Sequence, residues 1–454
     1  MEILNDAGAT IDKPKQKVFF PQKLIEKCLC TAPSSIALFD RDEKEKMQLE
    51  GNNVHFDPGS AALTILDWQS KRIRKANTTD LIHFSQVVDS LDNLAAQSTG
   101  LIASDVPREI QDRYRIFLSL LFGKKPIVSG TFTHDAFDSM KEMLIAVRGS
   151  EEKLREKPLA IFDCCPSAPL KWSNLTCQNL IDCARNGIPA ELVSMPLIGA
   201  TAPGTVAGAL VQVVAENLSG VVIHQLTHPG APIIWGGSPA AFDMRHGTTP
   251  MGAMETMMIE SASASVAKHF NLPTHAYMSL SDAKVLDMQA GLETGMGASI
   301  GALSRINVIS GPGMLNFETT QSLEKLVIDN EICGMALRLA KGIKFRDGFS
   351  DDLFGEIYDG EHFLTSSYTL QWMREEFYFP GKVISRENED MWTEKGEQSA
   401  GERAHEIVQD IIRAEPSVSL KKEIVGELFA IMEADAGKYG MDELPVSKSE
   451  IQND

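Results

Sequence analysis

The feature that most constrains the fold is a regular alternation of short apolar runs and longer helix-like segments. We expect strands at 99–103, 126–129, 159–163, 191–194, 232–235, 274–278, 305–309 and 357–364. Helices are expected between them, at 108–122, 135–147, 175–186, 205–227, 252–269, 282–304 and 322–341. Strands that alternate with helices indicate a parallel sheet, and eight such units predict a (β/α)8 barrel. The eighth strand is the least clear, so an open doubly wound sheet is the alternative.

The rest of the chain divides around this repeat. Residues 1–95 carry short strand-like segments and two helix signals, which predicts an α+β extension. The barrel is expected at 96–368. Residues 369–454 are acidic and helix-like, and we expect them to form helices that pack on the barrel, with the aromatic residues of 372–392 against it.

Composition excludes several classes of protein. The net charge of −19 without a basic stripe disfavours nucleic acid as a partner. No apolar run approaches the ~20 residues that span a bilayer, and no leader-like segment opens the chain, so we expect a cytoplasmic protein that is not membrane-bound. Seven cysteines at spacings unlike those of zinc sites indicate reduced thiols. A homo-oligomer is a mild expectation for a barrel with added helices.

The predicted strand ends carry mostly small residues and prolines. The seventh strand breaks into Gly-Pro-Gly at 311–313, and the fourth into P-L-I-G-A-T-A-P at 196–203. Because barrel enzymes carry their chemistry on these loops, the rim of the barrel is predicted to be open. Such a rim favours the docking of a flat, bulky group more than a small substrate alone.

Common catalytic motifs are absent. The chain has no Walker loop, no H-E-x-x-H and no G-x-S-x-G elbow. His134, Asp243 and His362 could supply metal ligands, but their spacing does not favour a site, and no bound metal is expected. Lys284 could form a Schiff base, although an ion pair with a neighbouring carboxylate is the more ordinary interpretation.

Several loop motifs together resemble the trimethylamine:corrinoid methyltransferase family. They are 196–203, H-P-G-A-P at 228–232, Gly236-Gly237, Asp243-Met244-Arg245, S-D-A-K-V-L-D-M-Q-A-G-L-E at 281–293, V-I-D-N-E at 327–331 and H-F-L at 362–364. The resemblance covers nearly the whole chain. It implies a (β/α)8 barrel that passes a methyl group from a methylamine to Co(I) of a separate corrinoid protein. The corrinoid belongs to that partner.

The chain departs from the founding members of that family near 310–315. They carry pyrrolysine there, whereas this chain has ordinary residues, with Gly313 and Met314 as the nearest counterparts. A quaternary ammonium leaves as a neutral amine and needs no such activation. The resemblance therefore implies the branch without pyrrolysine, similar to glycine betaine:corrinoid methyltransferase. Glycine betaine is the first choice of substrate, and carnitine, γ-butyrobetaine and proline betaine follow.

A quaternary ammonium has no N–H group, so aromatic faces are its natural partners. We expect the cavity to contain Phe132, Trp235 and Phe363, with Tyr277 and Tyr368 as further aromatic candidates. His134 and His362 are candidates for the substrate carboxylate, and Gly311 and Gly313 for close approach to the substrate. The corrinoid is expected to face Gly199, Gly237 and Met314. No catalytic side chain is expected, since cobalt is the nucleophile.

Two other functions fit the same residues. One is a protein that binds or senses a quaternary amine without turnover. The other is an unrelated barrel lyase that uses Lys284.

Overall fold

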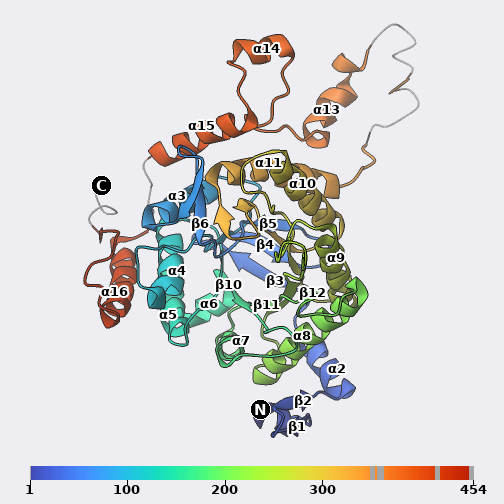
Figure 1. The fold of residues 1–454 in the computed structure, drawn as a ribbon. Coiled ribbons are helices and arrows are strands. Elements are labelled where there is room, and N and C mark those ends of the chain that lie inside the picture. The colour runs from blue at the N-terminus through green and yellow to red at the C-terminus, as the bar shows by residue number, and fades with distance from the viewer. Residues whose placement is uncertain (1, 348–352, 355–361, 415–419, 449–454) are drawn as a thin grey trace.

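The computed structural model describes residues 2–347, 353–354, 362–414 and 420–448. Eight short parallel strands form a ring at its centre, and helices surround them (Figure 1). Five make one sheet, in the order β13 (Ile233–Gly237), β11 (Ala190–Ser194), β10 (Ala160–Cys164), β9 (Ile127–Ser129) and β8 (Gln97–Ser98). The other three are β15 (His275–Tyr277), β16 (Val308–Ser310) and β5 (His55–Asp57).

Single backbone contacts join the two sheets at both edges. The Trp235 amide donates to the Pro273 carbonyl at 2.9 Å on one side, and the Ala95 amide donates to the Phe56 carbonyl at 2.8 Å on the other. The ladder is interrupted at these two seams, but the strand order is that of a (β/α)8 barrel. The predicted fold class is confirmed, and the alternative of an open doubly wound sheet is not adopted.

The eighth strand differs from the prediction. It is β5, which pairs in parallel with β16 and comes from the segment expected to be an extension. Residues 357–361 of the strand expected at 357–364 lie outside the described residues, and Phe363–Thr365 form a 3-10 turn, η2. The barrel thus takes its last strand from the N-terminal part of the chain.

Each barrel strand is followed by an outer helix, with rim strands intervening after some. In barrel order the helices are α3 (Thr78–Asp89), α4 (Gln111–Phe122), α5 (Ala136–Arg148), α7 (Asn174–Asn186), α8 (Val206–Thr227), α9 (Met254–His269), α10 (Met288–Leu303) and α11 (Leu323–Ala340). Two short helices, η1 (Arg108–Ile110) and α6 (Glu151–Glu156), precede α4 and follow α5. Side chains cap several of them: the Asp287 carboxylate accepts from the amides of Gln289 and Ala290. That cap starts α10 six residues after the predicted start at 282.

By length and composition, α8 could cross a membrane, and no other helix of the described residues passes the same test. Half of its most apolar stretch is buried, and it packs between α7 and α9 over β11. Its apolar character therefore matches that of a core helix of the barrel.

Two layers of side chains fill the lower part of the ring. The layer nearer the strand starts is apolar, and it packs on the hairpin of β3 (Ile36–Phe39) and β4 (Glu45–Leu49). This hairpin closes the amino end of the barrel. The next layer, two residues further along the strands, is polar. Its members include Asp57, Asp163, Glu191, His275 and Ser310.

Short strands order the rim at the carboxyl end. β17 (Met314–Leu315), β18 (Thr320–Gln321), β6 (Thr64–Asp67) and β7 (Arg72–Lys75) form one small sheet, and β12 (Leu197–Ile198) and β14 (Ala240–Ala241) form another. The Gly-Pro-Gly turn leads into the first. Gly313 has φ +87°, and a Cβ there would lie 2.0 Å from Gln321 Oε1. Packing and backbone conformation therefore explain this glycine.

The two ends of the chain lie on the outside of the barrel. The N-terminal part comprises α1 (Glu2–Asp6), β1 (Thr10–Asp12), β2 (Lys17–Phe19) and α2 (Gln22–Thr31), and α2 packs on α8. α15 (Ala400–Arg413) packs on α11, and α16 (Lys422–Lys438) packs on α5.

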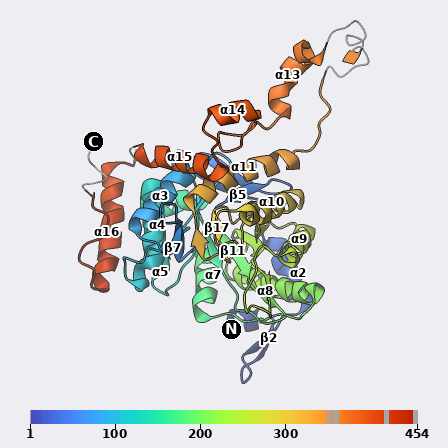
Figure 2. The same cartoon turned by 45° about the horizontal axis from the view of Figure 1, so that its top comes forward.

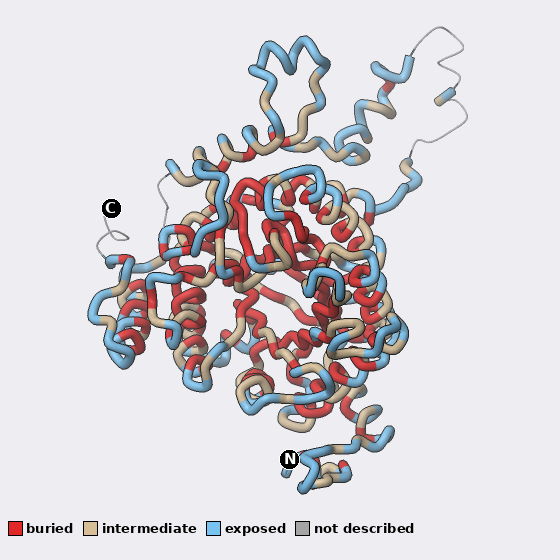
Figure 3. The backbone as a smooth tube through the Cα atoms, viewed as in Figure 1, coloured by how far each residue is buried: buried red, intermediate tan, exposed pale blue. Residues whose placement is uncertain are grey.

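Two helices described between α11 and α15 lie outside the barrel. α13 (Ser367–Glu376) and α14 (Glu389–Glu394) stand out beyond the ring in both views (Figure 1 and Figure 2). This part of the chain is mostly exposed (Figure 3). Phe377 and Phe379 are 63% and 61% exposed, so the expectation that they pack against the barrel is wrong.

Candidate active site

A cavity of about 1370 Å³ opens at the carboxyl ends of the barrel strands. Its walls come from the loops that follow β5, β8, β9, β10, β11, β13 and β16, and from the side chain of Tyr277 on β15. Barrel enzymes carry their chemistry at this end. Much of the lining is small, as the sequence predicted for the rim: Ser60, Ala61, Ser104, Gly130 and Ser238.

Aromatic side chains line opposite parts of the cavity. Phe132 follows β9, Phe317 follows β16 and Tyr277 lies on β15. The guanidinium of Arg115 lies 4.3 Å from the centre of the Phe132 ring, within the range of a cation–π contact. A cation and an aromatic face are therefore presented to the cavity together.

Arg115 is a buried cation on α4. It donates to the carbonyls of Thr99 at 3.0 Å and Gly130 at 3.4 Å, whereas its Nε–H has no partner among the described residues. Burial lowers the pKa of Arg115 to about 10, and it stays charged at neutral pH. Arg115 is therefore the buried cation of the cavity lining among the described residues.

Three carboxyl groups also line the cavity: the half-buried Asp163 on β10 and Glu318 in the rim hairpin, and the exposed Glu109. Glu318 ends a run of three residues with positive φ, Asn316 (52°), Phe317 (56°) and itself (64°). Such conformations are costly for residues other than glycine, and they persist where the surroundings impose them. Here they place Phe317 and Glu318 in the cavity wall. Burial, and then the nearby charge of Asp163, raise the pKa of Glu318 to about 8.

A chain of polar side chains continues below Asp163. Asp163 and Glu191 occupy matching positions on neighbouring strands. His275 Nδ1 lies 2.9 Å from Glu191 Oε1, and His275 Nε2 lies 2.9 Å from Ser310 Oγ. Ser310 in turn donates to Asp57 Oδ1 at 2.6 Å. Burial raises the pKa of Asp57 to about 7 and that of Glu191 to about 8.

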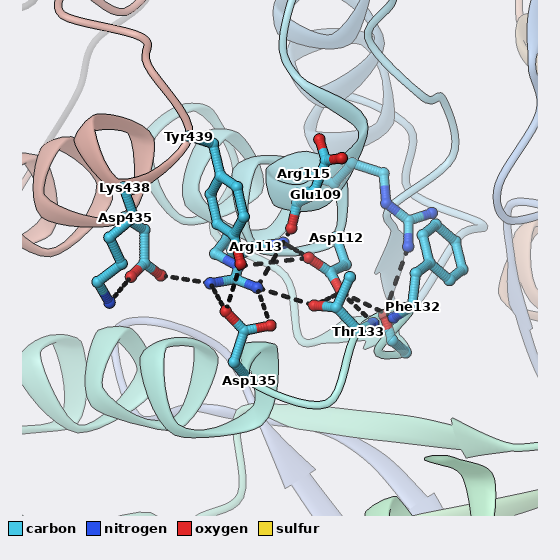
Figure 4. A network of polar contacts seen from close by, with 11 residues as sticks. Glu109, Asp112, Arg113, Arg115, Phe132, Thr133, Asp135, Asp435, Lys438 and Tyr439 are labelled. Carbon is cyan, nitrogen blue, oxygen red and sulfur yellow. Dashed lines mark hydrogen bonds and ion pairs between the residues drawn. The ribbon is translucent and has the colours of Figure 1, made fainter.

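The loop that carries Phe132 is held from behind by a buried ionic network (Figure 4). The carboxylate of Asp112 accepts from the amides of Phe132 at 2.7 Å and Thr133 at 3.0 Å. Arg113 lies next to it and pairs with Asp135 at 3.0 Å and with Asp435 of α16 at 2.8 Å. The C-terminal helix therefore braces the loop that bears the aromatic ring.

The structure places the predicted aromatic residues differently. Phe132 and Tyr277 line the cavity, as expected. Trp235 does not: it is 1% exposed, and its Nε1–H donates to Ser263 Oγ of α9 at 3.0 Å. Side chains of successive strand residues point to opposite faces, and Trp235 has the outward parity. Its predicted place in the site is wrong, because it packs between the strand and a helix.

The predicted histidines and the late aromatic residues lie elsewhere. His134 is exposed and outside the cavity lining. His362 and Phe363 precede the outlying helix α13, where Phe363 packs on Phe354 with ring centres 6.1 Å apart. Tyr368 lies on α13 itself. None of these three residues lines the cavity of the described residues, so their contact with the substrate stays a prediction.

The predicted glycines and Met314 also differ in where they lie, buried in packed surroundings or partly exposed at the rim. Gly311 and Gly313 are buried in the turn after β16 and do not line the cavity, and Gly237 and Met314 are buried in packed surroundings. Their prediction as substrate-facing or corrinoid-facing residues is wrong for that reason. Gly199 lies partly exposed in a rim loop with φ +89°, so its contact with a corrinoid stays a prediction.

Lys284 has a structural position. Its Nζ donates to the Asp282 carbonyl at 2.7 Å and lies 3.8 Å from the centre of the Phe317 ring. Lys284 does not line the cavity, so this site offers no lysine in the place that the lyase alternative requires. Among the residues that the structure describes, no group of three or more His, Cys, Asp or Glu could hold a metal ion.

Four residues of the cavity were not identified from the sequence: Arg115, Asp163, Phe317 and Glu318. Asp163 carried a usable signal, because it is an acid two residues past a buried position in an apolar strand. An acid at an inward position of a barrel strand has a cost that only function or a partner explains. Arg115, within an apolar helix, offered no comparable sign.

Comparisons with known proteins agree with this architecture. The family model of trimethylamine methyltransferase (MTTB) matches residues 1–435. A trimethylamine methyltransferase of Desulfitobacterium hafniense is 30% identical over 97% of this chain and 89% of its own. One of Methanosarcina barkeri is 31% identical over 97% and 90%. A glycine betaine methyltransferase of D. hafniense is 28% identical over 96% and 91%.

The fold has a solved counterpart. The monomethylamine methyltransferase of M. barkeri superposes with a TM-score of 0.51 at 10% identity, covering 90% of this chain and 86% of its own. Its hydroxylamine complex gives a TM-score of 0.53 at 11% identity, covering 90% and 85%. These structures support the barrel architecture. The family match spans almost the whole sequence, and this chain belongs to the trimethylamine methyltransferase family.

Proposed function

We propose that this protein moves a methyl group from a quaternary amine to Co(I) of a separate corrinoid protein. Glycine betaine is the proposed substrate, and dimethylglycine the amine released. The observation that carries this proposal is a cavity at the barrel mouth that joins aromatic faces, the half-buried carboxyl groups of Asp163 and Glu318, and one buried guanidinium. It rests on family membership for the reaction and on the cavity for the substrate.

The cationic head of the substrate suits one part of the cavity. The quaternary nitrogen of the betaine head carries three methyl groups and no N–H donor. It is therefore bound by ring faces, each worth ~0.5–2 kcal/mol, and by negative charge. Phe132, Phe317 and Tyr277 supply the rings, and Asp163 and Glu318 supply the carboxyl groups. A neutral ligand of the same shape would gain much less from these groups.

The carboxylate of glycine betaine suits Arg115. Its side chain lines the cavity and its guanidinium lies beside Phe132, so the head and tail of a short zwitterion can be bound close together. Of the described cavity residues, Lys75 and Arg108 are the other cations, and both are exposed. A relative named glycine betaine methyltransferase, 28% identical, points to the same substrate. So does the ordinary sequence at 310–315, since a quaternary amine needs no pyrrolysine.

The methyl acceptor is a co-substrate carried by its own protein, and Co(I) supplies the nucleophile. The residues present fit such a partner, because Ser60, Ala61, Gly130 and Ser238 leave part of the cavity lining free of large side chains. This chain orients the donor, excludes water from it and holds the methyl group toward the mouth.

A methyl-transfer assay tests the proposal. The protein is mixed with cob(I)alamin or a reduced corrinoid protein, and methylation of the corrinoid is followed by absorbance. We expect activity with glycine betaine and none with trimethylamine. Phe132→Ala should raise the KM for glycine betaine by about 2- to 30-fold, the loss expected for one ring face, whereas His134→Ala, on the same loop but outside the cavity, should not. Betaine binding without any methyl transfer would contradict the methyltransferase proposal and favour the alternative of a protein that senses a quaternary amine.

A further inference from the structure

The polar layer beneath the cavity contains more acid than its surroundings can ionise. Asp163 and Glu191 lie at matching positions of the neighbouring strands β10 and β11, so their carboxyl groups lie side by side inside the barrel. Two neighbouring carboxyl groups held away from water cannot both stay ionised, so one of them carries a proton. The pair therefore holds a shared proton between the cavity, which Asp163 lines, and the interior, where Glu191 is fully buried.

The layer around this pair offers little to replace the proton. No donor with suitable geometry faces either oxygen of Glu191 among the described residues, although His275 Nδ1 lies 2.9 Å from Oε1. Asp57 Oδ2 is likewise buried without a partner. Titratable and charged groups face Asp163 from every side, and they are Arg115, Asp57, Glu191, His275, Tyr277, Cys165 and Glu318.

Only two of those neighbours can carry positive charge, Arg115 and His275. Burial lowers the pKa of His275, which leaves it neutral near pH 7, so Arg115 stands alone against the acids of this layer. The acids of this layer therefore lack a second positive partner, and they lie at the floor of the cavity. A cationic ligand supplies it.

We propose that Asp163 exchanges a proton for the positive charge of the substrate. When a quaternary ammonium binds, the proton shared by Asp163 and Glu191 leaves for solvent, and the carboxylate of Asp163 pairs with the cation. A cation within ~4–6 Å lowers the pKa of a carboxyl group by about 1 to 3, which favours release of the proton. This proposal deepens the proposed function and rests on it for the substrate.

The same residue completes the cycle after methyl transfer. Loss of the methyl group leaves a neutral tertiary amine with a lone pair, and the positive charge that Asp163 compensated has gone. The pair takes up one proton again, and Asp163 passes it to the amine: its O–H bond breaks and an N–H bond forms. The product is then an ammonium without a lone pair, which cannot take the methyl group back.

Glu191, His275, Ser310 and Asp57 form the remainder of the layer. They connect by contacts of 2.9, 2.9 and 2.6 Å and hold the second carboxyl of the pair in place. We assign them as positioning residues, because none of the four lines the cavity.

Calorimetry in buffers of different ionisation enthalpy measures the proton directly. At pH 7 we expect about one proton released per glycine betaine bound, and none with 3,3-dimethylbutyrate, which has the same shape and carboxylate but a neutral head. Asp163→Asn should cut the release at least 5-fold. The control Glu109→Gln removes an exposed acid that lines the same cavity, and it should leave the release unchanged.

Turnover separates the two halves of the proposal. Asp163→Asn should keep the single-turnover rate of methyl transfer at saturating substrate within a few-fold and lower kcat at least 10-fold, because only the later proton step is lost. If Asp163→Asn fails to fold, the wild-type comparison of the two ligands decides alone. Equal proton release with both ligands, or none with either, would overturn the proposal.

The outcomes also separate this inference from the function. Methyl transfer from glycine betaine without proton release on binding would overturn the exchange and leave the methyltransferase standing. Proton release on binding without methyl transfer to any corrinoid would overturn the function and keep the exchange as a property of binding.

Discussion

The buried carboxyl of Asp57 should make the stability of the protein depend on pH. It is fully buried on β5, where one oxygen accepts from Ser310 and the other has no partner. Burial raises its pKa from 3.8 to about 7 in the folded state. Because the folded protein binds this proton more tightly than the unfolded chain, stability falls as the pH rises from about 4 to about 7.

The size of the effect follows from the two pKa values. At about 1.36 kcal/mol for each pKa difference of one, the penalty approaches about 4 kcal/mol above pH 8, and about 2.5 kcal/mol of it develops between pH 5 and 8. Asp57→Asn removes the titration. For a chain of this length, the melting temperature of the variant should gain about 3 °C on the wild type between these pH values.

Differential scanning calorimetry of both proteins at pH 5, 6, 7 and 8 measures this gain. The difference in melting temperature is compared across pH, so a constant cost of the substitution cancels. Asp138→Asn is the control, since 83% of that side chain is exposed. A difference for Asp57→Asn that stays constant within 1 °C would show that the carboxyl is ionised in the fold, and the assignment of protons in the barrel interior would be wrong.

Three further predictions concern the structure around the cavity. Asp112→Asn should weaken betaine binding several-fold by calorimetry, because the amides that hold Phe132 lose their charged acceptor, and lower the melting temperature by about 2 °C. Gly313→Ala should cost about 3 kcal/mol in urea unfolding, since φ +87° disfavours alanine and its Cβ would overlap Gln321; an unchanged midpoint would contradict the packing account. Lys284→Ala should lower methyl transfer less than about 5-fold, as it loses one cation–π contact, whereas a lyase would lose all activity.

The sequence predicted the outer helices well for a physical reason. Helices of twelve or more residues repeat their apolar positions over several turns, and polar caps such as Thr205 and Ser322 mark their starts. The eighth strand was missed because β5 sits among other short strands, and β6 and β7 separate it from its helix α3, so it does not show the strand–helix repeat. Nothing local distinguishes it; its partner β16 lies about 250 residues away in the chain.

The site was predicted less well than the fold. Trp235 was chosen for its chemistry, although its neighbour Ile234 belongs to the inner apolar layer and therefore fixes Trp235 on the outside. The same parity places Asp163 inside with Ile161, so alternation along the strand was the stronger guide. Glu318 depends on three consecutive positive φ angles, which no residue pattern there announces.

The order of layers inside the barrel explains why a cation is the ligand that this cavity selects. The hairpin of β3 and β4 closes the amino end with apolar side chains, so no water reaches the acids from below. Above it, Asp57, Asp163 and Glu191 share one interior with a single guanidinium, and each must stay protonated or meet a positive charge. An anion in the cavity would add to that excess, and a neutral ligand would leave it unchanged. A quaternary ammonium can replace a proton there without needing a hydrogen-bond acceptor of its own.

The carboxylate of a betaine then requires a partner on the far side of the head, and Arg115, beside Phe132, is the buried cation in reach. Arg115→Lys should therefore weaken the binding of glycine betaine more than the binding of choline. Choline has the same cationic head without the carboxylate, and the ammonium of lysine lacks the planar donors that match a carboxylate. Calorimetric affinities for the two ligands measure this, and an equal loss for both would place the carboxylate elsewhere.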